Sequence, residues 1–430
     1  MPGPESPRFR RSPRRWVVPP GLSAADEPFE GYTVLAEIRD GLGVVLWQSL
    51  RDLDLWSTSP PEARRALLTP GVVQRRKAWL ASVLEPGSPL LAPLRLLSRA
   101  VEGRARVGAD DVVDACHAVS KWAAGHGHSR TATAFAQSAA FAAPDRASAA
   151  YEVALLARRG AEYRRAETWF RRALGLARRT GDWKHYGLAC VGLGNLFLQR
   201  GDYPTARGWF NRSLRVARRH GLWHVRPMAL HDLFCMAAKA GQLQEAEMYA
   251  RRAFRAYGRR HPRLVALAHD VGRFWMLKGD YARALKVLRA VLPHIERKAE
   301  RRVANSNIAL AAAGLGDRFV FAAMWSEVWR EIGERDDTEG VPNALLNLAR
   351  GAAALGDRER AQLAATHALR SAIQRREAEV RLAAESLLEG LRGPRLSLGS
   401  GPDRPYGEAS ADALVTDLVD ALMDEPAEPV

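Results

Sequence analysis

The sequence of 430 residues contains only three cysteines, which lie far apart and form no Cys-X-X-Cys pair: Cys116, Cys190 and Cys235. This scarcity argues against a disulfide-stapled scaffold and favours a reducing compartment, so we expect a cytoplasmic protein. No run of eighteen or more apolar residues occurs, so we expect no membrane-spanning helix and no membrane partner. The N-terminus is basic but has no apolar segment of secretory length.

The chain also lacks the short motifs of common catalytic sites, since GxxxxGK[ST], HExxH and GxSxG are all absent. His220 and His224 are four residues apart, but Gly221 lies between them and no thiolate or carboxylate set accompanies them. The His-Gly-His stretch at 126–128 is more typical of a turn than of a ligand pair. We therefore expect no enzymatic activity, no cofactor and no metal site.

Lysine is scarce too, because only seven of the 64 basic residues are lysine. Heavy use of arginine fits a GC-rich coding bias, so the net charge of +16 does not by itself predict a ligand. The charge is unevenly spread: residues 157–302 contain 32 basic and 11 acidic residues, whereas residues 401–430 contain eight acidic residues and one arginine. This asymmetry is more informative than the total.

The N-terminal part divides into two segments. Residues 1–29 are rich in proline and arginine with little periodic hydrophobicity, which predicts a disordered basic tail. Residues 30–105 show helical periodicity, with apolar residues three and four apart from Leu35 to Leu46, and we expect a block of three helices. The stretch STSPPEARR at 57–65 has the composition of a helix start, and EPGSP at 85–89 marks a break.

From about residue 110 the chain is repetitive. WFRRALGLARRTGDW at 169–183 has a near-copy, WFNRSLRVARRHGLW, forty residues later. A turn glycine followed five residues later by alanine recurs in five units, which begin at Gly127, Gly201, Gly241, Gly279 and Gly356. Gly160 with Ala166 and Gly316 with Ala322 fit with one extra residue, although Phe321 holds the five-residue position in the latter. Periods of about 34–40 residues predict a solenoid of about seven helix pairs over residues 110–392.

The stretch 169–183 predicts a helix with a buried apolar stripe. The stripe consists of Trp169, Phe170, Ala173, Leu174 and Ala177. The arginine pair 178–179 falls in the last turn, where cations suit the helix dipole, and Gly181 is at the expected C-terminal cap. Trp183 and, one unit later, Trp223 then open the following helices. The arginine pairs thus have a structural explanation before a functional one.

Val191–Phe210, VGLGNLFLQRGDYPTARGWF, resembles the tetratricopeptide repeat through Leu193, Gly194, Phe197, Ala206 and Phe210. Cys190 replaces the family's early tryptophan, and a closing proline is missing. VGRFWMLKGDYARAL at 271–285 is a second match, whereas the units at Gly316 and Gly356 are degenerate. Several units exceed the usual length, as in the longer-helix variants found in bacterial regulators. The resemblance implies an all-α, right-handed solenoid.

The resemblance also implies a binding surface, because in this superfamily the first helix of each pair lines a concave groove that holds extended peptides. It places six residues on that face: Asn195, His231, His269, Arg273, Asn347 and Arg350. The asparagine at 195 stands where the family often uses an amide to bind a peptide backbone, and arginine pairs with carboxylates. The simpler alternative is that all six are solvated positions without a dedicated partner.

The C-terminal segment has the features of a ligand for the chain's own groove. After a flexible linker at 393–409, residues 410–430 combine Leu414, Leu418, Leu422 and Met423 at helical spacing with acidic residues. Such an acidic amphipathic segment could bind a basic groove, either in its own chain or in a second copy, and the latter would give a homo-oligomer. The sequence agrees equally well with a terminal helix that caps the solenoid or is frayed. We expect a non-enzymatic scaffold that binds an acidic protein or peptide segment. A nucleic-acid-binding protein and a ligand-sensing regulatory module are the alternatives.

Overall fold

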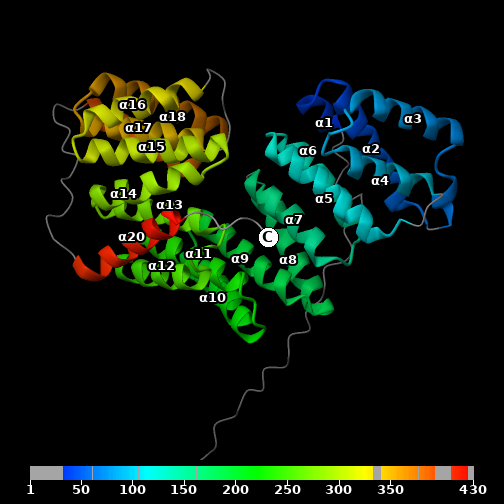
Figure 1. Cartoon of the computed structure of the whole chain (residues 1–430), viewed down its shortest axis with the longest axis horizontal. Coiled ribbons are helices and arrows are strands. Elements are labelled where there is room, and N and C mark those ends of the chain that lie inside the picture. Colours follow the sequence, from blue (N-terminus) through cyan, green and yellow to red (C-terminus); the bar gives the residue numbers. More distant parts are fainter. Residues whose placement is uncertain are drawn as a thin grey trace, which may run out of the picture. The chain divides into compact units, whose positions relative to one another are not determined.

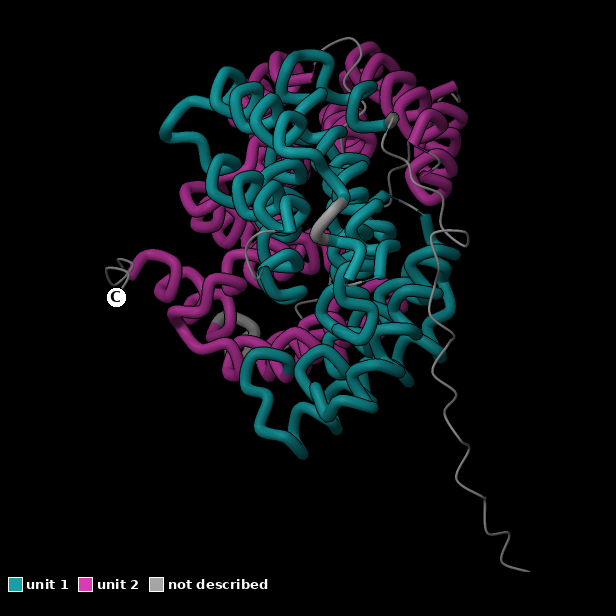
Figure 2. Tube along the Cα trace, turned by 90° about the vertical axis from the view of Figure 1, so that its right-hand side faces the viewer, with its two compact units in different colours: residues 1–225 teal, residues 226–430 magenta. Residues whose placement is uncertain are grey.

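The computed structural model describes residues 32–60, 62–103, 107–160, 162–332, 340–375, 377–392 and 408–424. Within these residues all regular elements are helices, so the expected fold class, an all-α solenoid of helix pairs, is confirmed (Figure 1). The chain forms two compact units, residues 1–225 and 226–430 (Figure 2). None of the described helices is long and apolar enough to cross a membrane. The predicted tail at 1–29 and most of the linker at 393–409 lie outside the described residues.

Unit 1 begins with α1 (Tyr32–Glu37), α2 (Gly41–Thr58), the 3-10 turn η1 (Ala63–Ala66), α3 (Pro70–Val83) and α4 (Leu91–Glu102). A block of three helices was expected here, but the described residues contain four α-helices, because α1 ends at Glu37 and Asp40 caps a new helix through the backbone N–H groups of Leu42 and Gly43. The helix start predicted at 57–65 is wrong. That stretch ends α2 and forms η1, and the next helix begins at Thr69 and Pro70 instead.

The rest of unit 1 is three helix pairs: α5 (Ala109–Gly125) with α6 (Ser129–Ala142), α7 (Ala147–Arg159) with α8 (Tyr163–Thr180), and α9 (Trp183–Gln199) with α10 (Tyr203–Arg219). The stripe predicted for the second helix is confirmed, since all five of its residues in α8 are buried. Gly181 caps α8 with a positive φ of 74°, and Trp183 opens α9 as expected. Trp223 does not open its helix, because α11 begins at Val225 and the indole is 72% exposed.

Close packing of α9 depends on two glycines. A Cβ at residue 192 would overlap the ring of Phe170 in α8, and one at residue 194 would overlap the ring of Phe210 in α10. The two aromatic rings are fully buried and occupy the space that the missing side chains leave. This explains why the glycines stand inside a helix despite their low helix propensity.

Unit 2 contains α11 (Val225–Lys239), α12 (Leu243–Tyr257), α13 (Leu264–Leu277), α14 (Tyr281–Val291), the 3-10 turn η2 (Leu292–His294), α15 (Lys298–Gly314), α16 (Arg318–Glu331), α17 (Val341–Ala354), α18 (Arg358–Arg375), α19 (Ala378–Arg392) and α20 (Glu408–Met423). Helices α11 to α18 make four consecutive pairs. Together with unit 1, the described residues therefore contain seven pairs, followed by α19.

The turns within the pairs are built alike. Six of the predicted turn glycines have φ between 72° and 83°: Gly127, Gly201, Gly241, Gly279, Gly316 and Gly356. In several turns the next residue is an aspartate whose carboxylate accepts the backbone N–H three residues later, as Asp317 does from Val320 at 3.0 Å. Gly160 differs, with φ of −77°. In the Gly316 unit it is Phe321, not Ala322, that takes the buried place.

The acidic C-terminal segment folds as α20 and packs against α14 in the same unit (Figure 1). Its apolar side is buried through Leu414, Val415, Leu418, Ala421 and Leu422, whereas Met423 is 72% exposed. The helical part of the prediction is thus correct. The contact lies on the second helix of a pair, and not on the first helices where the groove residues were expected.

Candidate functional site

The six predicted groove residues all lie on first helices of pairs. Asn195 is half-buried in α9 of unit 1. The other five lie in unit 2, with His231 on α11, His269 and Arg273 on α13, and Asn347 and Arg350 on α17. Three of these five belong to one connected group of polar side chains, which we call the polar network. Its members are His231, Cys235, His269, Asp270, Ser306, Asn307 and Asn347.

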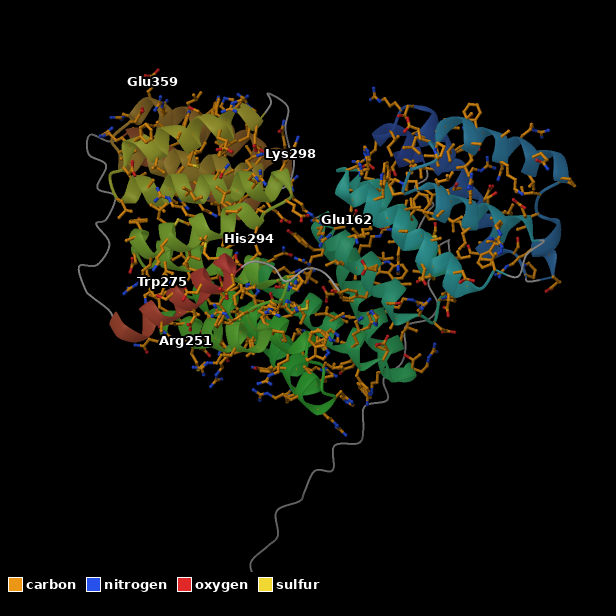
Figure 3. All side chains as sticks on the ribbon, viewed as in Figure 1. Glu162, Arg251, Trp275, His294, Lys298 and Glu359 are labelled. Carbon is orange, nitrogen blue, oxygen red and sulfur yellow. The ribbon has the colours of Figure 1, made fainter. Side chains whose placement is uncertain are left out.

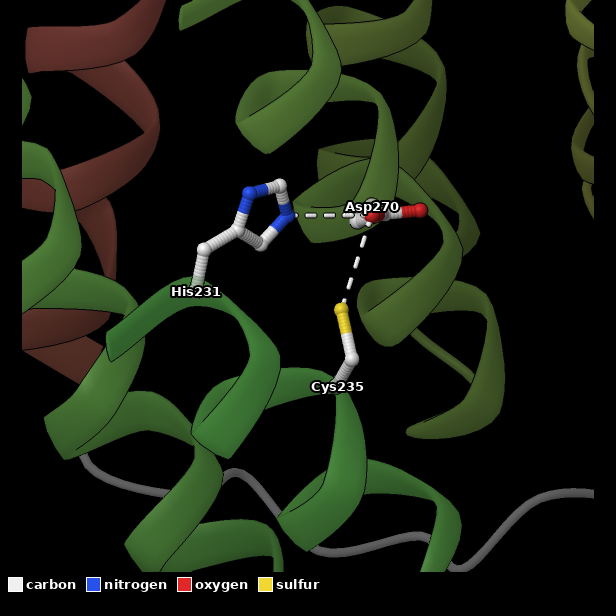
Figure 4. Close-up of side chains that lie close together, drawn as sticks. All are labelled: His231, Cys235 and Asp270. Carbon is white, nitrogen blue, oxygen red and sulfur yellow. Dashed lines mark hydrogen bonds and ion pairs between the residues drawn. The ribbon is translucent and has the colours of Figure 1, made fainter. Parts of the chain in front are cut away.

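Asp270 of α13 is the hub of the network (Figure 4). Its Oδ2 lies 3.0 Å from Nε2 of His231 and accepts a hydrogen bond from Sγ of Cys235 at 3.5 Å. The histidine and the cysteine are one helical turn apart on α11, so they project from the same face of that helix. The carboxylate therefore joins two consecutive helix pairs.

The other oxygen of Asp270 faces the neighbouring imidazole. Its Oδ1 lies 3.7 Å from Nδ1 of His269 and 3.7 Å from Nη1 of Arg273, beyond hydrogen-bond length, so these contacts are electrostatic. Burial acts against the ionised carboxyl group, but the contacts with His231 and His269 outweigh it and hold the pKa of Asp270 well below its usual range. Asp270 is therefore an anion at neutral pH.

The thiol of Cys235 is kept in its protonated form. Burial, followed by the negative charges of Asp270 and Asp232, raises its pKa well above the usual value. A thiolate is the nucleophilic form of cysteine, and this environment suppresses it. Cys235 hydrogen-bonds the carboxylate rather than the imidazole, so the trio lacks the Cys–His contact that activates a nucleophile.

The network continues into the next two helix pairs. Nδ2 of Asn307 in α15 lies 2.9 Å from Nε2 of His269, within hydrogen-bond distance. Nδ2 of Asn347 in α17 lies 2.7 Å from Oδ1 of Asn307 and 3.2 Å from Oγ of Ser306. Hydrogen-bonding side chains thus run from α11 through α13 and α15 to α17.

Two of the predicted residues, Arg273 and Arg350, lie at the exposed margin of these helices. Arg273 is about half exposed, with a side-chain exposure of 52%, and approaches Asp270. Arg350 is exposed on α17, one turn beyond Asn347. The Arg273 guanidinium is therefore accessible to a negatively charged partner beside the network, whereas burial lowers the pKa of the Arg350 guanidinium against the opposing charge of Glu379.

Sequence reasoning missed Cys235, Asp270, Ser306 and Asn307. The signal was present, because residues 231 and 270 are one repeat apart, as are 269 and 307, and 307 and 347. Asn305, Ser306 and Asn307 also form a polar run inside the otherwise Ala-rich helix α15, and all three are buried. Ser306 and Asn307 hydrogen-bond to neighbouring helices, whereas the buried amide of Asn305 has no hydrogen-bond partner among the described residues.

The histidines that were weighed as metal ligands have other neighbours. The ring of His220 stacks on Trp183 with centroids 4.4 Å apart, and that of His126 stacks on Trp122 at the same separation. His224 packs edge-on against Trp223. Residues 126–128 form the expected turn, with Gly127 at a φ of 83°.

A second polar surface in unit 2 lies on α12. A hollow of about 370 Å³ is lined by Gln244, Glu247, Met248, Arg251, Arg252 and Arg255 (Figure 3 labels Arg251). Arg251 donates to Glu247 at 2.8 Å, whereas Arg252 and Arg255 are exposed. This arginine hollow is on the second helix of its pair and is separate from the polar network.

Comparison with known proteins agrees with this architecture. Residues 145–219, which contain helices α7 to α10, match the model of the tetratricopeptide repeat family. No curated protein sequence matches the chain. Among solved structures, it is similar to the Rap conjugation gene regulator of the plasmid pLS20, with 14% identity, a TM-score of 0.50, and coverage of 82% of this chain and 98% of that one.

Two further structures show weaker likeness. A Rap protein complexed with competence and sporulation factor has 10% identity and a TM-score of 0.47, over 81% of this chain and 98% of that one. PilF of Pseudomonas aeruginosa has 16% identity and a TM-score of 0.37, over 52% and 92%. The tetratricopeptide repeat match thus covers residues 145–219, and the glycine turns and helix pairs in the rest of the described repeats have a similar build.

Proposed function

We propose that the chain is a non-enzymatic interaction module that binds a peptide or protein segment across the polar network of unit 2. The observation that carries this proposal is the spacing of the network. His231, Asp270, Asn307 and Asn347 come from four successive first helices and recur about once per repeat. Three members of this row, His231, Asp270 and Asn347, are partly exposed and can meet the repeated polar groups of an extended peptide backbone, whereas Asn307 is buried and holds its neighbours in place.

The mutual hydrogen bonds of the network support a binding role. Side chains that are held by one another lose little freedom when a ligand arrives, so less of the binding free energy is spent on ordering them. The pLS20 Rap regulator, which shares the fold, was solved in complex with the Phr* peptide. A peptide is therefore the first ligand class to test for this chain.

The exposed arginines favour an acidic partner. Arg273 and Arg350 flank the network, and each can hold a carboxylate through two parallel N–H groups. The chain's own acidic helix, α20, is bound within the same unit, where Arg259 contacts Asp424. Unit 2 thus already holds one acidic segment, and we propose that an external partner has the same character.

Selection of a random-peptide phage library on the immobilised full-length chain tests the proposal. We expect the selected peptides to be rich in Asp and Glu. Their affinity, measured by fluorescence anisotropy, should fall at least about tenfold with Arg273→Glu, because charge-assisted hydrogen bonds contribute about 1.5–3 kcal/mol. Asn347→Ala should weaken the same peptides through loss of a hydrogen bond.

Arg252→Glu is the matched control, since it makes the same charge change at an exposed residue of unit 2 but in the arginine hollow of α12. An equal loss of affinity in Arg252→Glu and Arg273→Glu would contradict a site at the network. Titration with a short DNA duplex over a salt series examines the nucleic-acid alternative. Tight binding that falls steeply with salt and depends on Arg252 would overturn the peptide proposal.

A further inference from the structure

Three side chains at the hub of the polar network carry the donor atoms of a metal site. Nε2 of His231, Sγ of Cys235 and Oδ2 of Asp270 all lie within 4.8 Å of one another. They form the one such group of three among the residues that the structure describes. The two α11 ligands are four residues apart on one helical face, and the third comes from α13 (Figure 4).

The separations of these atoms are close to the edges of a zinc coordination tetrahedron. Bond lengths of about 2.0–2.1 Å to nitrogen, 2.3 Å to sulfur and 2.0–2.2 Å to oxygen place neighbouring ligand atoms roughly 3.3–3.7 Å apart. Here the sulfur–oxygen separation of 3.5 Å falls in that range, the nitrogen–oxygen separation of 3.0 Å is a few tenths of an ångström shorter, and the sulfur–nitrogen separation is at most 4.8 Å. A cation could therefore replace the two hydrogen bonds with small side-chain movements.

We propose that His231, Cys235 and Asp270 bind a divalent cation of the zinc class. A thiolate and an imidazole select zinc, or cobalt as its substitute, over magnesium and calcium, which prefer all-oxygen sites. Three protein ligands leave the fourth position to water or to a partner's donor atom. This site is an addition to peptide binding and does not depend on it.

Charge balance supports the assignment. The metal converts the thiol of Cys235 into a coordinated thiolate with release of one proton to solvent. The neutral imidazole, the carboxylate and the thiolate then carry two negative charges, which a divalent cation cancels. A neutral site costs much less to bury than a separated charge.

The surroundings also resemble those of metal ligands in general. Ligating side chains are usually oriented by an outer layer of hydrogen bonds and charges. Oδ1 of Asp270 faces His269 and Arg273, and His269 is in turn held by Asn307. The bound metal would connect α11 to α13, that is, two consecutive helix pairs of unit 2.

Titration of the metal-stripped full-length chain with Co²⁺ tests the site. We expect one equivalent of Co²⁺ to give the visible absorption of tetrahedral cobalt and a near-ultraviolet thiolate-to-cobalt band, both removed by Zn²⁺ and neither by Mg²⁺. Cys235→Ser should abolish the thiolate band. His231→Ala and Asp270→Asn should each weaken Co²⁺ binding at least about tenfold, as loss of even an outer-layer contact can do.

His185→Ala is the control, because His185 also pairs with an aspartate, Asp182 at 2.6 Å, but belongs to no three-ligand group among the described residues. This variant should keep both absorption bands. If Cys235→Ser is unfolded by circular dichroism, Cys235→Ala replaces it. A chain that gives no thiolate band, or a band that persists without Cys235, would overturn the proposal whether or not peptides bind.

Discussion

Arg259 and Asp424 are joined across 165 residues of sequence: Nε and Nη2 of the guanidinium group donate to the same carboxylate oxygen, at 3.2 Å and 2.7 Å. Asp424 directly follows α20, and Arg259 lies in the connection between α12 and α13. The hydrogen bond to Asp424, with the negative charges of Asp420 and Asp417, raises the pKa of Arg259. The acidic helix and its basic neighbour therefore meet within one compact unit.

Leu418→Asp should release α20, because the leucine is fully buried and burial of a leucine stabilises by about 1.5–3 kcal/mol. Hydrogen exchange should show that the amides of residues 408–424 lose protection while α13 and α15 keep theirs. Met423→Asp is the matched control on the same helix, where the side chain is 72% exposed. If both variants keep full protection, the packing of α20 on α14 is wrong.

Gly194→Ala should destabilise the fold by about 1–3 kcal/mol, because the added methyl group would stand 2.9 Å from Cζ of Phe210 and closer to two other ring carbons. The change is measured as the free energy of unfolding in urea. Gly208→Ala lies in the interior of α10 with open space around its Cβ position, and should stabilise by about 0.5–1 kcal/mol. Equal effects at the two positions would contradict the close approach of α9 and α10.

Asp317→Ala should destabilise α16 by about 1 kcal/mol, since it removes the side chain that accepts from the N–H of Val320. Asp317→Asn keeps an oxygen acceptor at the same place and should cost much less. The free energies of unfolding of the two variants in urea distinguish the contribution of the capping hydrogen bond from that of the negative charge. A loss in the asparagine variant as large as in the alanine variant would show that charge, and not capping, is responsible.

His117 should make unit 1 sensitive to mild acid. Burial lowers the pKa of this imidazole, with Arg146 and His185 lowering it further against the opposing effect of Asp114. The unfolded chain therefore takes up the proton more readily than the folded chain. Stability should be complete above the unfolded pKa of about 6.5 and should decline as pH falls below it.

The measurement is the urea midpoint of the wild type and His117→Gln at pH 7.5 and at about pH 5. The variant should lose less stability over this interval, because its residue 117 no longer binds a proton. His294→Gln, at an exposed turn, should behave like the wild type. A pH dependence that is unchanged in His117→Gln would contradict the role assigned to this group.

Local patterns made most of the fold predictable. The stripe from Trp169 to Ala177 and the cap at Gly181 follow from helical spacing and glycine geometry, and the structure confirms both. The start of α3 was misplaced because two prolines at 60–61 resemble the Pro that does begin the helix at 70. The two proline-containing stretches are alike in local sequence, and only tertiary packing decides which of them begins the helix.

The candidate site was predictable only in part. His231, His269 and Asn347 could be placed on first helices by counting from turn glycines, but that count does not reveal their partners. Asp270 adjoins His269 in sequence and yet acts with His231 and Cys235 on another helix. Such a meeting depends on how neighbouring repeats are rotated against each other, and no single repeat contains that information.

The Gly-Asp turns have a consequence for how the array can change in length. A turn such as 316–317 supplies its own left-handed residue and its own helix cap, so it needs nothing from elsewhere in the chain to form. Whole repeats could be duplicated or lost by recombination at these turns without disturbing the turn that remains. The same event would add or remove one set of hydrogen-bonding side chains, so the polar network would lengthen or shorten by one repeat.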